Sequence, residues 1–143
     1  MEAIAVHECG HALVASQTGL RTRWMCIKQD WDGGTSGWTE VADEDHDDPS
    51  KRREVLLLLT AGIQAASIWA YRVHRWPARD ARRWGQGTGC RDQEMFAHYA
   101  RGTGFTMAMA RSQVTPILAQ HWGRITRGSA LLVRRQKMPA SRV

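Results

Sequence analysis

The residue spacing with the clearest chemical meaning is His7-Glu8-Cys9-Gly10-His11, near the start of the chain. Side chains four residues apart lie on one face of an α-helix, so His7 and His11 could bind a single metal ion from the same side. Two imidazole nitrogens, one further protein ligand and a water molecule suit zinc, and Glu8 would lie beside that water as a proton acceptor. The spacing therefore indicates metal-dependent hydrolysis of a peptide bond.

The residues around this HExxH motif decide whether the two histidines share a helix face, because the bare motif also occurs by chance. The segment Ala3–Ala15 contains strong helix formers and no proline, and Gly19 follows as a C-terminal cap. We therefore expect a helix over about Glu2–Thr18. This context favours a metal site over a coincidental pair of surface histidines.

The sequence around the motif, A-V-H-E-C-G-H-A-L-V-A, resembles the zinc helix of the FtsH-type metallopeptidases, which commonly reads A-x-H-E-A-G-H-A-L-V. The similarity extends over most of the chain and weakens after this helix. Residues 56–66 resemble the family's buried L-x-G-G-R-A-A-E helix, with Gln64 in place of the arginine and Ser67 in place of the glutamate. The resemblance implies a zincin-like helical metallopeptidase domain.

The same resemblance points to a third metal ligand. In the family an aspartate in a T-G-A-S-N-D-L segment binds the zinc, and Ala-Arg follows eight and nine residues later; here residues 88–92 read T-G-C-R-D and residues 100–101 read A-R. The resemblance therefore implies that Asp92 joins the two histidines as a Zn²⁺ ligand. The segment is one residue shorter than the family's between glycine and aspartate, which leaves Glu94 and the Cys90 thiolate as alternatives.

The length of the chain limits what it can contain. Its 143 residues suffice for one peptidase-like domain, residues 1–143, and are too few for a peptidase and an ATPase together. The membrane-bound members of the family carry a fused ATPase that unfolds substrates, and no G-x-x-x-x-G-K-[ST] phosphate loop occurs here. We therefore expect a stand-alone endopeptidase whose polypeptide substrate is flexible or already unfolded, or one that works with a separate unfoldase or regulatory protein.

Cysteine usage and hydropathy bear on the cellular setting. Three cysteines, at positions 9, 26 and 90, form neither a C-x-x-C zinc pair nor an even set for disulfides, and no secretory signal opens the chain. Both features favour a cytoplasmic protein. The longest uncharged run, Val55–Tyr71, is interrupted by Thr60, Gly62, Gln64 and Ser67, so we interpret it as a buried core helix and expect no transmembrane segment.

Periodicity and turn residues predict the remaining elements. Two short strands, Trp24–Gln29 and Gly37–Val41, should form a hairpin, and such an edge strand could pair with an extended substrate. A helix over Pro49–His74 should be followed by a mobile connection, residues 75–89, without periodicity. The expected fold class is mainly α (α+β), with a small β hairpin.

Two further helical regions are expected towards the C-terminus. One should cover about Arg91–Arg101, and the other should run from about Phe105 to Gln136. Pro116 and Gly123 suggest a break or kink within the second region.

An acidic run and a group of tryptophans need separate interpretations. Residues 43–48, D-E-D-H-D-D, are predicted to be a solvated loop that ends with Asp48 as a helix N-cap, because the glycine and glutamate of an EF-hand calcium loop are missing.

Trp24, Trp31 and Trp38 cluster around the predicted hairpin, where exposed aromatic rings could line a substrate groove. The tryptophans at positions 69, 76 and 122 fall in apolar stretches and are interpreted as packing residues.

The charge of the chain supports a competing class of function. Twenty Lys and Arg against fourteen Asp and Glu give a net charge of +6, which would suit nucleic acid, an anionic membrane surface or an acidic protein. No recognisable nucleic-acid module accompanies this charge, so we favour a solvated cationic face and expect no nucleic-acid partner. Two alternatives to the zinc endopeptidase stay open: a non-catalytic peptidase-like scaffold that binds a protein partner, and a basic nucleic-acid-binding module.

Overall fold

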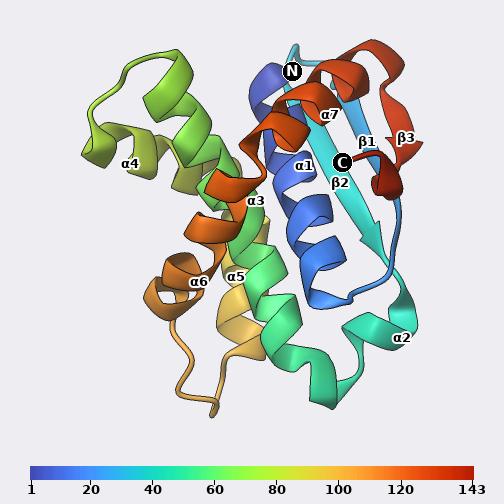
Figure 1. Ribbon diagram of the computed structural model, residues 1–143, viewed down its shortest axis with the longest axis vertical. Helices are drawn as coiled ribbons and strands as arrows, with labels where there is room; N and C mark the ends of the chain where they lie inside the picture. The colour runs from blue at the N-terminus through green and yellow to red at the C-terminus, as the bar shows by residue number, and fades with distance from the viewer.

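The computed structural model describes all 143 residues of the chain (Figure 1). Seven α-helices pack with a three-stranded antiparallel sheet, which is the mainly α (α+β) class that the sequence predicts. The helices are α1 (Glu2–Thr18), α2 (Asp43–His46), α3 (Arg52–Val73), α4 (Ala78–Thr88), α5 (Cys90–Tyr99), α6 (Met107–Gln120) and α7 (Trp122–Arg135). The strands are β1 (Thr22–Gln29), β2 (Thr35–Val41) and β3 (Lys137–Pro139), and two 3₁₀ turns cover Pro49–Lys51 and Ala140–Arg142.

Helices α1 and α3 form the centre of the fold. In Figure 1, α1 lies between α3 and the sheet, and α7 crosses over it. A Cβ atom on Gly10 would lie 2.6 Å from the Cβ of Ala65 and 2.8 Å from the carbonyl oxygen of Ala61, so the missing side chain lets the two helices approach closely. Every residue of α1 from Ala5 to Ala15 is buried. The two histidines of the HExxH motif therefore lie inside the protein rather than on its surface.

The sheet has the strand order β2-β1-β3, so β2 has a partner strand on one side only. The predicted hairpin is present, and both strands begin earlier than expected, at Thr22 and Thr35. Strand β3 is an element that sequence reasoning missed, because three residues are too few to show a period of two. Met138 of β3 is buried opposite Met25 of β1, which attaches the C-terminal end of the chain to the sheet.

The prediction of a solvated acidic loop is wrong for Asp45, which is buried in α2. Lys51 Nζ and Arg21 Nη2 lie 2.5 Å and 2.8 Å from Asp45 Oδ1. Hydrogen bonds from these two cations hold the pKa of the carboxyl well below its ordinary value of 3.8. Asp48 accepts a hydrogen bond from the backbone N–H of Ser50 at 2.8 Å, which confirms the predicted N-cap.

The prediction of a mobile connection over residues 75–89 is wrong, because most of it forms α4. Its glycines lower helix propensity, but tertiary packing outweighs that preference. Gly85 faces α3 so closely that a Cβ atom would collide with the hydroxyl of Ser67. Trp84 stacks on Trp69 of α3, with ring centroids 5.8 Å apart and planes inclined by 29°.

The C-terminal helices also correct one expectation. Helix α6 continues through Pro116, and the break falls at His121, between α6 and α7. Val114 and Leu118, on either side of the proline, are fully buried. Their packing holds the helix together at a position where proline removes a backbone hydrogen bond.

One segment, Pro49–Val73, is long and apolar enough to cross a membrane by length and composition alone. In this fold 72% of its most apolar window is buried by other parts of the chain, and a core helix meets the same criteria of length and composition.

Candidate metal centre

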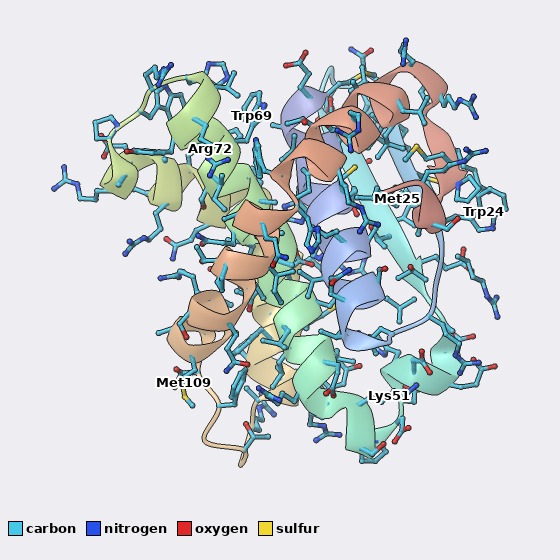
Figure 2. All side chains as sticks on the ribbon, in the orientation of Figure 1. Trp24, Met25, Lys51, Trp69, Arg72 and Met109 are labelled. Atoms are coloured by element: carbon cyan, nitrogen blue, oxygen red, sulfur yellow. The ribbon has the colours of Figure 1, made fainter.

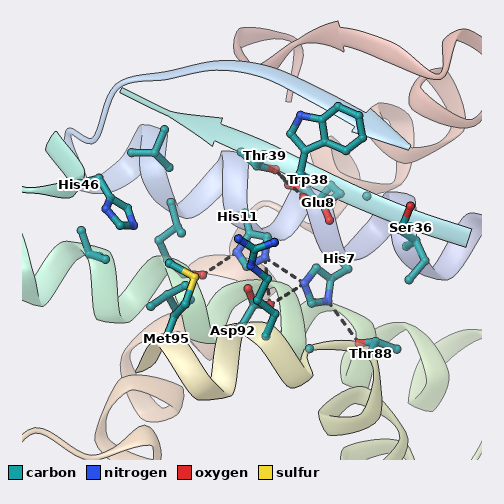
Figure 3. A pocket seen from close by; sticks show the side chains of 18 of the residues that line it. His7, Glu8, His11, Ser36, Trp38, Thr39, His46, Thr88, Asp92 and Met95 are labelled. Carbon is teal, nitrogen blue, oxygen red and sulfur yellow. Dashed lines mark hydrogen bonds and ion pairs between the residues drawn. The ribbon is translucent and has the colours of Figure 1, made fainter. Parts of the chain in front are cut away.

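Three side chains with metal-ligating atoms converge where α1, α3 and α5 meet (Figure 3). His7 and His11 project from α1, and Asp92 projects from the first turn of α5. His7 Nε2 lies 2.9 Å from His11 Nε2 and 2.9 Å from Asp92 Oδ2, and His11 Nε2 lies 3.4 Å from the same carboxylate oxygen. The fold thus brings together the three residues named from the sequence.

Hydrogen bonds on the far sides of the imidazoles determine where their protons lie. His11 Nδ1 is 2.7 Å from the carbonyl oxygen of Leu58, which can only accept, so Nδ1 carries the hydrogen. His7 Nδ1 is 3.2 Å from the hydroxyl of Thr88, whose own hydrogen is donated to the carbonyl of Gly85, so this Nδ1 is also the donor. In the neutral rings both Nε2 atoms therefore present lone pairs to the centre of the cluster.

The cluster consequently holds two nitrogen lone pairs and one carboxylate oxygen with no hydrogen among them. Three such acceptors repel one another unless a cation or an added proton lies between them. In a tetrahedral zinc site, ligand atoms are separated by about 3.3 Å, and the distances of 2.9–3.4 Å found here are close to that value. The donor set and its spacing fit a divalent cation such as Zn²⁺.

The pKa values of the same groups show that the cluster attracts positive charge. Burial lowers the pKa of His11, but the neighbouring Asp92 carboxylate raises it more strongly, to about 9. Burial raises the pKa of Asp92, but the two histidines outweigh that effect and hold it well below its ordinary value. Both shifts favour positive charge at this position, from an added proton or from a bound cation.

Gly62 of α3 provides the space that the two imidazoles occupy. A Cβ atom at this position would lie 2.5 Å from the Nε2 atoms of both His7 and His11. Any side chain here would push the rings away from their present positions. The glycine is therefore part of the site, although its chemistry gives no sign of that in the sequence.

Glu8 lies next to the cluster, on the side that faces β2 (Figure 3). Its carboxylate is buried, and Oε2 accepts a hydrogen bond from the hydroxyl of Thr39 at 2.8 Å. Burial raises the pKa of Glu8 above its ordinary value, and the histidines and Thr39 offset part of that rise. A buried carboxylate of raised pKa is a stronger base than a solvated one.

The cluster opens into a cleft of about 730 Å³. One wall is β2, where five consecutive residues, Thr35–Thr39, line the cleft. The opposite wall comes from α3 and α5, and its apolar part includes Leu58, Leu59 and Met95. A cleft of this volume, lined by both polar and apolar side chains, can take part of a polypeptide beside the His7, His11 and Asp92 cluster.

The structure distinguishes among the alternatives for the third ligand. Asp92 lies in the cluster, whereas Glu94 and Cys90 are exposed and take no part in it. The Cys90 thiol instead lies 3.5 Å from the carbonyl oxygen of Gly87, as a local donor. Of the predicted aromatic residues, Trp38 lines the cleft, and Trp31 is fully exposed at the hairpin turn.

Sequence reasoning missed four groups that position the site: the Leu58 carbonyl, the Thr88 hydroxyl, Gly62 and Thr39. The first two orient the imidazoles through contacts between residues 47 and 81 positions apart in the chain. The sequence hints at two of these groups only weakly. Gly62 is a glycine inside an apolar helix, and Thr39 lies two residues after Gly37 in a strand that packs back on α1.

The sequence matches no protein-family model and none of the curated proteins with which it was compared.

Proposed function

We propose that the protein is a zinc-dependent endopeptidase that hydrolyses peptide bonds in flexible or unfolded polypeptide segments. The observation that carries this proposal is the convergence of His7 Nε2, His11 Nε2 and Asp92 Oδ2, with the Glu8 carboxylate beside them in an open cleft. The resemblance of α1 to the zinc helix of the FtsH-type metallopeptidases supports the same conclusion. A cation held by the three ligands would act as a Lewis acid on the attacking water and on the scissile carbonyl.

Glu8 has the environment of a general base. Its carboxylate accepts a proton from the attacking water, holds it in a buried position and delivers it to the leaving amine. Thr39 fixes the orientation of the carboxylate through Oε2, so Oε1 is the oxygen left to accept that proton. Burial, which raises the pKa of Glu8, makes the proton transfer more favourable.

Strand β2 has the position of a substrate-binding edge. Its backbone pairs with β1 on one side, and residues Thr35–Thr39 line the cleft. An extended polypeptide could add to this edge through backbone hydrogen bonds, which tolerate many sequences. Most strands of a folded domain are already paired within it, so this cleft suits flexible segments, or chains supplied by a separate unfoldase or regulatory protein.

The experiment that tests the proposal compares Glu8→Gln with Glu2→Gln on the same helix. Glu2 is an exposed carboxylate outside the cleft, so its substitution controls for the loss of one negative charge. Both variants should bind one zinc per chain. Glu8→Gln should cleave an unfolded fluorescent polypeptide at least 100-fold more slowly than the wild type, and Glu2→Gln should cleave it at the same rate.

Two results would contradict the proposal. Cleavage by Glu8→Gln at the wild-type rate would show that another group accepts the proton. Zinc binding without cleavage of any unfolded polypeptide by the wild type would favour a non-catalytic scaffold.

A further inference from the structure

The turn that joins α3 to α4 carries exposed apolar side chains together with arginines. We call residues 71–83 the α3–α4 corner; it projects at the upper left of Figure 1, away from the sheet. All ten residues from Tyr71 to Asp80 are exposed. Among them Tyr71, Val73 and Trp76 leave 55%, 54% and 38% of their surface open to solvent. These three apolar side chains lie within a stretch of six residues.

Five of the twenty Lys and Arg residues of the chain lie in the same segment. The corner contains one acidic residue, Asp80, whose Oδ1 lies 3.6 Å from Arg79 Nε. Its basic residues are five arginines: Arg72, Arg75, Arg79, Arg82 and Arg83. The corner thus has a net charge of +4 within a chain of +6. Figure 2 shows Arg72 at this end of α3, below Trp69.

Arg75 keeps its side chain at the corner against a backbone preference. Its φ angle is 58°, in the left-handed region that glycine adopts without strain. The backbone N–H of Trp76 bonds to the carbonyl of Ala70, which closes the end of α3 in the manner of a helix cap where glycine is usual.

The arrangement of the exposed side chains favours a lipid surface over a nucleic acid. Tyr71 and Val73 are two residues apart on α3 and so lie about 200° apart around the helix, which places apolar groups on several sides of the corner. The ring faces are also occupied: Trp84 stacks on Trp69, and Trp76 meets Trp84 edge-on at 5.6 Å. Few faces are left for bases to stack on.

We propose that the α3–α4 corner binds the surface of an anionic lipid membrane. The Arg72 guanidinium lies over the Trp122 ring, 5.2 Å from its centroid, so the other four arginines contact lipid headgroups. Tyr71, Val73 and Trp76 enter the interface between headgroups and acyl chains, where aromatic and apolar side chains are stable. This inference does not depend on the metal centre, which lies at the middle of α1 and α3, and it would stand if the protein bound no zinc.

The test is sedimentation of the full-length chain with lipid vesicles of two compositions, phosphatidylcholine alone and phosphatidylcholine with phosphatidylserine. Wild-type protein should sediment only with the anionic vesicles. A variant that combines Arg79→Gln, Arg82→Gln and Arg83→Gln should bind them about 100-fold more weakly, at roughly five-fold for each arginine. The matched control replaces three exposed arginines of α7, Arg127, Arg134 and Arg135, by glutamine and should bind as the wild type does.

Two single substitutions separate this proposal from simple charge attraction. Arg75→Gly should weaken binding about five-fold while it raises the temperature of unfolding or leaves it unchanged, because glycine relieves the backbone strain. Val73→Ser should weaken binding to anionic vesicles although it alters no charge. An unchanged affinity in both variants would contradict the proposed corner.

Other outcomes would also overturn the proposal. Equal binding to both vesicle types, or to neither, would exclude anionic lipid as the partner. An equal loss in the α7 control would show that net charge, and not the corner, drives binding. Tight binding to single-stranded oligothymidine at physiological salt, with vesicles ignored, would make nucleic acid the partner instead.

Discussion

Two carboxylates, Asp45 and Asp92, lie in opposite electrostatic settings. Asp45 is fully buried, and its charge is balanced by Arg21 and Lys51, so the cluster needs no further ion. Asp92 has only the two histidines as ion-pair partners, and both point nitrogen lone pairs at it in their neutral form. The charge of Asp45 is balanced within the protein, whereas Asp92 and its two histidines leave a position for an added proton or for the metal ion that we propose.

The difference shows how a structural ion pair can be told from a ligand site. Acidic residues lie near basic groups in both clusters, and both carboxyls have a lowered pKa. The two clusters differ in whether the groups that surround the carboxylate can lose their hydrogens. The imidazoles are fixed by acceptors, the Leu58 carbonyl and the Thr88 hydroxyl, which leave their other nitrogens without hydrogen. Lysine and arginine stay protonated at neutral pH, so they offer no nitrogen lone pair to a metal ion.

The largest expected effect is the loss of zinc on removal of a histidine ligand. His7→Ala or His11→Ala should weaken zinc binding by more than about 1000-fold, beyond the 10–100-fold typical of residues that only support a ligand. Asp45→Asn should leave zinc affinity unchanged, because the oxygens of Asp45 already accept hydrogen bonds from Arg21 and Lys51. Isothermal titration with a zinc buffer measures both. Loss of zinc binding in Asp45→Asn would break the distinction between the two carboxylates.

Gly62→Ala should have the next largest effect, because its Cβ would lie 2.5 Å from both ligand nitrogens. We expect zinc affinity to fall about 100-fold through displacement of the rings. Gly87→Ala in α4 is the control: nothing lies within 4 Å of a Cβ there, and alanine should stabilise the helix by about 0.5–1 kcal/mol. Wild-type zinc affinity in a folded Gly62→Ala protein would contradict the placement of the imidazoles.

Thr88→Val should have a smaller effect on the metal. It removes the acceptor of the His7 Nδ1 hydrogen, and zinc affinity should fall about ten-fold. Thr88→Ser keeps the hydroxyl and should restore the affinity. If valine and serine behave alike, the hydrogen bond does not orient His7.

Asp45→Asn should act on stability and on its pH dependence. Because the pKa of Asp45 in the folded protein lies below its ordinary value of 3.8, its ion pairs stabilise the fold above that pH, and this stabilisation is lost as the pH falls through the folded pKa. Asp45→Asn should therefore unfold at a lower temperature than the wild type near pH 7. The gap should narrow below about pH 4. A gap independent of pH would show that the carboxylate charge does not stabilise the fold.

The parts of the fold that local sequence determines could be predicted. Helix α1 was expected over the residues that it occupies, because its helix formers and Gly19 act within the segment. Helix α4 could not be predicted, because its glycines and arginines favour a loop until Trp84 and Gly85 meet α3. Asp45 was misjudged for the same reason, since the cations that it pairs with lie outside its own acidic run.

The candidate site also combines residues that local spacing predicts with residues that meet only after folding. The spacing of His7, Glu8 and His11 is a local property, and the sequence alone placed them together. Asp92 was reached only through a family resemblance, because no periodicity links residues 85 positions apart. Gly62 and Thr88 act through contacts that exist only after folding, and neither residue type is specific to metal sites.

X-ray absorption at the zinc edge of the zinc-saturated protein, together with its metal content, would show whether His7, His11 and Asp92 bind the ion. We expect one zinc per chain, bound by two imidazole nitrogens and by oxygen ligands at about 2.0–2.2 Å. A metal content well below one, or a sulfur ligand at about 2.3 Å from a cysteine, would contradict it.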